Sequence, residues 1–106
     1  PFIAFSGLHI TGPAVATVQL RSVKGGKLSI AWRSEGQKDF LAEQITHHEL
    51  AGAEEFQSIS LPIPAQGTTI HIRLLLPEGR SDLRSLAIKD SNGKEVKKWS
   101  FQTQPE

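Results

Sequence analysis

Cysteine is absent from the 106-residue sequence. Its absence excludes a disulfide framework and every zinc or iron–sulfur site that depends on cysteine ligands. Long apolar runs are missing too, because stretches such as Leu74-Leu75-Leu76 fall far short of the roughly 20 residues that a membrane span needs. We therefore expect no membrane-spanning segment and a fold that its core holds together without covalent cross-links.

An excess of either charge is also missing. The chain has 12 Lys and Arg residues against 11 Asp and Glu residues, and its longest basic block is Lys97-Lys98. Nucleic acids and anionic membranes are bound largely through bulk positive charge, so this balance argues against both as partners. The length fits a single domain, residues 1–106. Because the chain begins with Pro1 rather than Met, we expect it to be the excised C-terminal part of a longer protein.

The strongest pattern lies in residues 14–34, where apolar and polar side chains alternate along two arms. A period of two places each set on one face of a strand. The arms meet at Lys24-Gly25-Gly26-Lys27, and because glycine adopts a positive φ without strain, this joint predicts a tight hairpin. The expected inward residues are Ala14, Ala16, Val18, Leu20, Leu28, Ile30 and Trp32, and the expected outward ones are Thr17, Gln19, Arg21, Ser29 and Arg33.

Similar short segments follow along the chain, separated by turns rich in Gly, Pro and Asn. Residues 7–11, 42–50, 56–63, 68–76, 83–89 and 95–101 are expected as strands, and residues 2–5 as an edge strand or a packed lead-in. The segment at 42–50 also allows a helix, but Ile45-Thr46 favours a strand. Asp90-Ser91-Asn92-Gly93 predicts a hairpin turn. About eight strands without a helical pattern indicate an all-β fold, an antiparallel β-sandwich or jelly roll.

No motif in the sequence predicts catalysis. No Ser lies in a Gly-x-Ser-x-Gly elbow, and a Ser, His and Asp set can be chosen from any chain of this length. His47 and His48 point to opposite faces of a strand and cannot share a metal ion, so we expect one exposed and one partly buried histidine. Residues 90–93 lack the later carboxylates of a calcium loop. We expect no enzyme and no cofactor; a structural calcium is compatible with such a sandwich, but the sequence does not place its ligands.

The aromatic residues best suited to stack on a sugar ring are better interpreted as core residues. Trp32 and Trp99 each share a strand face with apolar neighbours. Phe40 follows the polar loop at residues 34–39 and is expected to anchor that loop in the core.

Polar residues on the outward strand faces are stronger candidates for binding. If these faces belong to one sheet, they form a basic groove, and the planar fork of arginine suits carboxylate, sulfate or phosphate groups. The alternative is a solvated face with cross-strand salt bridges, or a face that docks on a neighbouring domain. The candidate ligand-binding residues are Arg21, Arg33, His48, His71 and Arg73, with Gln19 beside them.

Several motifs occur together along nearly the whole chain. They are Gly7-Leu8-x-Ile10-x-Gly12-Pro13, Gln19-Leu20-Arg21-Ser22, Gly25-Gly26, Trp32-Arg33-Ser34-x-x-Gln37-Lys38-Asp39-Phe40, Leu61-Pro62, Gly67, Ile72-Arg73-Leu74, and Gly93 with Trp99-x-Phe101. With these motifs the chain resembles the C-terminal β-sandwich of bacterial sulfatases of the alkaline-phosphatase superfamily. That arylsulfatase-type module is similar to galactose-binding-like and carbohydrate-binding jelly rolls.

The resemblance implies a periplasmic or secreted parent enzyme that acts on sulfated glycans, with the catalytic sulfatase domain of the same chain as partner. The sulfatase signature, Cys or Ser-x-Pro-x-Arg, is absent, because Ser60-Leu61-Pro62-Ile63-Pro64 lacks the arginine. We therefore expect a non-catalytic accessory domain that either binds carbohydrate, such as a sulfated glycan, or braces the catalytic domain. An adhesion sandwich that binds other proteins, unrelated to sulfatases, is the alternative.

These roles predict different surfaces. Carbohydrate binding predicts an exposed aromatic residue, or a cluster of Arg, His and Gln, on a sheet face or loop rim. Bracing predicts an exposed apolar patch that contains Leu75, or Phe2 and Phe5.

Overall fold

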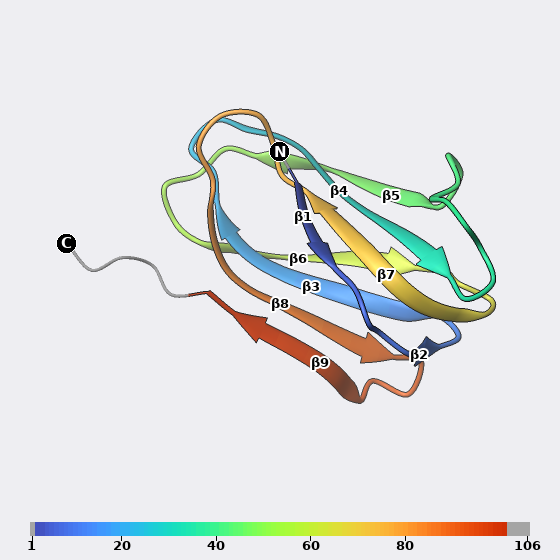
Figure 1. Cartoon of the computed structure of the whole chain (residues 1–106). Coiled ribbons are helices and arrows are strands. Elements are labelled where there is room, and N and C mark those ends of the chain that lie inside the picture. Colours follow the sequence, from blue (N-terminus) through green and yellow to red (C-terminus); the bar gives the residue numbers. More distant parts are fainter. Residues whose placement is uncertain (1, 102–106) are drawn as a thin grey trace.

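The computed structural model describes residues 2–101, which form two antiparallel sheets packed face to face (Figure 1). Sheet A contains β1 (Phe2–Phe5), β2 (Ile10–Thr11), β4 (Gly25–Ser34), β5 (Ile45–Ala51) and β7 (Thr68–Leu75). Its strand order is β1-β7-β4-β5, with β2 also paired to β7. Sheet B contains β3 (Ala14–Arg21), β6 (Gln57–Ile63), β8 (Asp82–Asp90) and β9 (Glu95–Ser100), in the order β6-β3-β8-β9. The expectation of an all-β antiparallel sandwich is confirmed.

No helix in the described part of the chain is long and apolar enough to cross a membrane.

The predicted hairpin between residues 14–21 and 28–34 is wrong. β3 belongs to sheet B and β4 to sheet A, so the chain crosses from one layer to the other at residues 22–24 (Figure 1). Gly25 has a φ of +75°, and a Cβ there would overlap the carbonyl oxygen of Leu50 and the amide of Gly52. The glycines therefore bring the start of β4 against the end of β5, where a side chain would not fit.

The core lies between the two sheets and consists of the side chains that the alternation placed inward. Val18 and Leu20 on β3 are fully excluded from solvent and lie in one cluster with Ile30 on β4 and Leu74 on β7. Each such aliphatic side chain stabilises the fold by roughly 1.5–3 kcal/mol. The inward assignment of the two arms is therefore confirmed, although their pairing is not.

Both tryptophans pack into this core, as expected. Trp32 is 4% exposed. The half-buried Trp99 has its ring centroid 4.5 Å from that of Phe5, with the two ring planes tilted by 40°. The Phe101 ring meets the Phe5 ring edge-on, with 6.3 Å between their centroids. These rings join β1 of sheet A to β9 of sheet B and close one side of the sandwich.

The expected turns and strand limits need few changes. β5 begins at Ile45 rather than at residue 42, because residues 42–44 form a turn in which the Gln44 amide donates to the Leu41 carbonyl. The hairpin at residues 90–93 is confirmed: Asp90 Oδ1 accepts from the amides of Asn92 and Lys94, at 2.9 and 3.0 Å. The segment at residues 2–5 is a ninth strand.

Candidate functional site

The outer face of sheet A brings together three of the five predicted binding residues. Arg33 on β4 lies opposite His71 on β7, and Arg73 lies two residues further along β7, opposite Ala31. Residues two apart on a strand point to the same side, and diagonal cross-strand neighbours are about 7–8 Å apart. Arg33, His71 and Arg73 thus form one group, which we call the arginine cluster.

Two phenylalanine rings contact the guanidinium group of Arg73. Its guanidinium carbon lies 4.1 Å from the ring centroid of Phe40 and 5.1 Å from that of Phe2. The Phe40 ring also meets the His71 ring, 4.9 Å away between centroids. Rings that cover a guanidinium plane leave its in-plane N–H groups as the available donors. The Nε of Arg73 is buried and has no hydrogen-bond partner.

Phe40 corrects the expectation that it anchors its loop in the core. It lies on the outer face of sheet A, against Arg73 and His71. Phe2 was expected only in an apolar bracing patch and not beside the arginines, and it is 55% exposed. A phenylalanine in a polar loop reveals nothing about the sheet face it will cover, so only the structure identifies this contact.

The arginine cluster has no acidic partner among residues 2–101. Ion pairs in that range involve Arg21 and Arg80, and neither Arg33 nor Arg73 makes one. Arg33 Nη1 instead donates to the Gln37 carbonyl at 2.6 Å, which fixes its guanidinium against the loop. Burial lowers the pKa of His71 from its ordinary value of 6.5, and the positive charges of Arg33 and Arg73 lower it further. The cluster is therefore cationic enough to disfavour a third positive charge.

A depression of about 690 Å³ adjoins the cluster on the same face. Ser29 is 3% exposed and lies between His47 on β5 and Leu75 on β7 in the sheet register. His47 Nδ1 and Ser29 Oγ are hydrogen-bonded at 2.6 Å. Small residues on β4 thus form the floor of this depression, and larger residues on β5 and β7 form its sides. Lys24 and Lys27 line one end of it.

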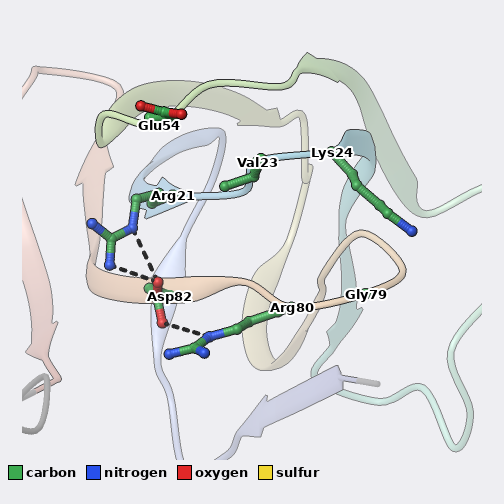
Figure 2. A pocket seen from close by; sticks show the side chains of 7 residues that line it. All are labelled: Arg21, Val23, Lys24, Glu54, Gly79, Arg80 and Asp82. Atoms are coloured by element: carbon green, nitrogen blue, oxygen red, sulfur yellow. Dashed lines mark hydrogen bonds and ion pairs between the residues drawn. The ribbon is translucent and has the colours of Figure 1, made fainter.

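Arg21, a fourth predicted residue, lies on the other sheet. It lines a depression of about 770 Å³ at one end of the sandwich, where three connections between the sheets meet (Figure 2). Its Nε and Nη2 donate to Asp82 Oδ2 at 3.0 and 2.8 Å, and Arg80 Nε lies 3.8 Å from Asp82 Oδ1. In Figure 2 the two arginines converge on the carboxylate, whereas Lys24 points away from it.

The Arg21 side chain is also covered by an aromatic ring. Its guanidinium carbon lies 4.9 Å from the Phe56 ring centroid, and that of Arg84 lies 3.8 Å from it. Arg21 therefore has a carboxylate partner and a stacking partner within the chain. The hypothesis that the predicted arginines line one groove is wrong in this respect, because their strands belong to two sheets.

His48 does not join the arginine cluster either. On β5, His48 lies on the same inward face as Leu50 and is half-buried, whereas His47 faces outward and is exposed. The prediction of one exposed and one partly buried histidine is confirmed. His47 was missed as a site residue because its partner Ser29 is 18 residues away and becomes its neighbour only through the β4–β5 register.

Neither metal chemistry nor similarity to other proteins assigns this surface a role. No group of three or more His, Asp and Glu side chains within residues 2–101 is arranged to hold a metal ion. Comparisons of the chain with models of protein families, with curated proteins and with solved structures find no match. The function must therefore be argued from the surface itself.

Proposed function

We propose that this protein is a non-catalytic accessory domain that binds an anionic glycan on the outer face of sheet A. The observation that carries the proposal is the arginine cluster: two arginines and a histidine side by side, without a carboxylate partner in the described chain. The group recognised is a sulfate or a carboxylate, because both offer the paired oxygens that the edge of a guanidinium binds.

The packing of Arg73 prepares it for such a ligand. Phe2 and Phe40 hold the guanidinium plane, so little side-chain entropy remains to be lost when an oxyanion binds at its edge. An anion would also offset the repulsion between the two arginine side chains. A charge-assisted hydrogen bond contributes about 1.5–3 kcal/mol, which corresponds to roughly ten- to a hundredfold in affinity.

A glycan suits this face better than a peptide or a nucleic acid. β4 and β7 each have a paired neighbour on both sides, so their backbone groups are not free for strand addition, which occurs at sheet edges. Side chains must supply the contacts, and the exposed ring of Phe2 offers a surface for a sugar. The net charge of +1 does not favour nucleic acid.

The resemblance to sulfatase C-terminal sandwiches supports a sulfated glycan as the ligand. In the same proposal, the catalytic partner is a sulfatase-like domain of the same chain, and the parent enzyme acts in the periplasm or outside the cell. The gene sequence upstream of Pro1 tests this part: a domain with a Cys or Ser-x-Pro-x-Arg signature is expected there, and its absence would contradict it.

Calorimetric titration with a sulfated oligosaccharide and its desulfated counterpart tests the binding. The sulfated ligand is expected to bind, more weakly as the salt concentration rises. An Arg33→Ala, Arg73→Ala double variant is expected to lose about a hundredfold in affinity or more. The matched control is Lys89→Ala with Lys98→Ala, which removes two exposed cations from the outer face of sheet B. Equal loss in both double variants, or equal binding of both ligands, would contradict the proposal.

Bracing of a catalytic domain is the second candidate function, and one observation favours it. Phe2 is largely exposed and lies opposite Leu75 in the β1–β7 register, so the two form a small apolar patch at the edge of the same face. Phe5, by contrast, belongs to the core. Bracing becomes the better account if neither the sulfated nor the neutral oligosaccharide binds at millimolar concentration.

A further inference from the structure

The depression on the outer face of sheet A continues into the arginine cluster. One of the residues that line it, Ile45 on β5, is paired with Ala31 on β4, and Ala31 is paired in turn with Arg73 on β7. Ser29, which also lines the depression, comes two residues before Ala31 and lies on the same face of β4. Both of these side chains on β4 are small, so neither separates the depression from Arg73. A ligand bound at Arg73 can therefore extend over Ala31 into the depression.

His47 lines the side of this depression, and its ring is held by Ser29. The side chain of His47 is exposed, and its Nδ1 is hydrogen-bonded to Ser29 Oγ at 2.6 Å. Because Nδ1 is engaged in this way, Nε2 is the ring nitrogen that remains for a ligand. Nε2 is a donor or an acceptor according to the tautomer, and a hydroxyl group suits both because it accepts as well as donates. A ring that is fixed beforehand also loses less entropy on binding.

The rest of the lining suits an uncharged sugar better than a second anion. The half-buried Leu75 on β7 offers apolar surface to the C–H groups of a sugar ring. The exposed Lys24, Lys27 and Glu78 line the far end of the depression. Glu49 lies opposite Lys27 in the β4–β5 register. The positive charges there are thus matched by negative ones, and all four groups donate to or accept from hydroxyls.

We propose that the depression binds an uncharged sugar residue, linked to the sugar whose anionic group binds the arginine cluster. His47 binds its hydroxyls, and Ser29 is the positioning residue that orients His47. The inference rests on the proposed function and adds the size and order of the ligand, a glycan in which a charged residue is joined to a neutral one. Ser29 and Arg33 are about 13 Å apart along β4, at the usual rise of a strand, which is more than one sugar residue spans.

The histidines of the chain allow NMR to observe the two parts of this surface separately. His71 belongs to the arginine cluster and His47 to the depression, and their imidazole Cε1–H signals are assigned with His71→Gln and His47→Gln. Galactose 6-sulfate is expected to move the His71 signal and not the His47 signal. Lactose 6′-sulfate and lactose 6-sulfate place a neutral sugar on opposite sides of the sulfated one. At least one of them is expected to move both signals, and neither should move the signal of the exposed His9.

Calorimetric affinities test the roles of the two residues in the depression. The better disaccharide is expected to bind roughly tenfold more tightly than galactose 6-sulfate. His47→Phe keeps a ring without nitrogens and should lose this advantage, while its affinity for galactose 6-sulfate stays that of the wild type. Ser29→Ala should lose part of the advantage, and Ser29→Thr, which keeps the hydroxyl, should restore it. His9→Phe, at the exposed site before β2, is the matched control and should retain it in full.

The outcomes separate a failure of this inference from a failure of the proposed function. If both disaccharides move the His71 signal but not the His47 signal, the glycan binds at the arginine cluster and its second residue does not occupy the depression. Retention of the full disaccharide advantage by His47→Phe would lead to the same conclusion. If no sulfated sugar moves the His71 signal at millimolar concentration, the proposed function itself is wrong, and the inference fails with it.

Discussion

Each sheet has an arginine stacked on phenylalanine, but the two stacks differ in whether the arginine also has a carboxylate partner. On the outer face of sheet A, Arg73 contacts the rings of Phe2 and Phe40 and lies beside Arg33 and His71. At the end of sheet B, one ring, that of Phe56, contacts both Arg21 and Arg84. The second stack includes a carboxylate and the first does not.

The carboxylate decides what each stack can do. Asp82 accepts two hydrogen bonds from Arg21 and lies within ion-pair distance of Arg80, so these arginines have an acidic partner within the chain. At the arginine cluster the repulsion is not compensated within the described chain, and the pKa of His71 falls for that reason as well as through burial. The stack at Arg21 favours stability, whereas the stack at Arg73 leaves positive charge available to a ligand.

Supplying the missing carboxylate should produce the largest change. Ala4 is exposed on β1 and lies directly opposite Arg73. In Ala4→Asp the new carboxylate can pair with Arg73 as Asp82 pairs with Arg21, and it would compete with an anionic ligand. We expect affinity for a sulfated oligosaccharide, measured by calorimetry, to fall about tenfold or more, while the free energy of unfolding changes by less than about 0.5 kcal/mol.

Ala4→Asn is the control, because it adds nearly the same volume without the charge. It should leave the affinity within about twofold of the wild type. If the two variants weaken binding equally, the charge of the cluster is not what holds the ligand.

Removing the existing carboxylate should have the next largest effect, on stability. Asp82→Asn leaves Arg21 and Arg80 without their charged acceptor, and we expect a loss of about 1 kcal/mol in the free energy of unfolding by urea denaturation. The loss should shrink in high salt, which screens this partly exposed pair. Asp39→Asn, in the exposed loop before Phe40, is the control. An unchanged stability of Asp82→Asn would mean that the two stacks do not differ in the way we describe.

The smallest expected effect is the contribution of His71 to the pH dependence of stability. Its folded-state pKa lies below 6.5, so the unfolded chain binds the proton more readily. Stability should therefore fall as the pH drops below about 6.5, and not change above it through this residue. Thermal unfolding of His71→Gln between pH 7.5 and pH 5 should show a weaker dependence than the wild type.

The groups that face His71 are Arg33, Arg73 and the ring of Phe40. A bound anion would oppose the two cations and raise the pKa of His71, so ligand affinity should increase as the pH falls through the same range. His9→Gln, at an exposed site before β2, is the control for general histidine effects. An identical pH profile for wild type and His71→Gln would contradict the assignment.

Much of the architecture could be predicted from local pattern, because burial on one side of a strand enforces a period of two. Val18, Leu20, Ile30 and Trp32 are buried as that period requires. The turn at residues 90–93 was equally predictable, since Asp90 and Gly93 act through contacts only a few residues away. Such features depend on neighbours in the chain.

The candidate site was only partly predictable because its neighbours are remote in the chain. Alternation showed that Arg21, Arg33 and Arg73 point outward, but a period of two does not say which sheet a strand joins. The Gly25-Gly26 joint suggested a hairpin that would have placed Arg21 and Arg33 in the same sheet. In the fold the chain crosses to the other layer at residues 22–24, and the same glycines begin β4.

The sequence by itself determined which side of each strand is apolar and where the chain turns, because these depend on side chains a few residues apart. Only the tertiary structure decided which outward residues meet. It separated Arg21, which is paired with Asp82, from Arg33 and Arg73, which have no such partner, and it brought Phe40 onto the outer face of sheet A. The physical reason is that strand pairing joins residues tens of positions apart. Which strands pair depends on how the two apolar sheet faces pack together and not on any one segment.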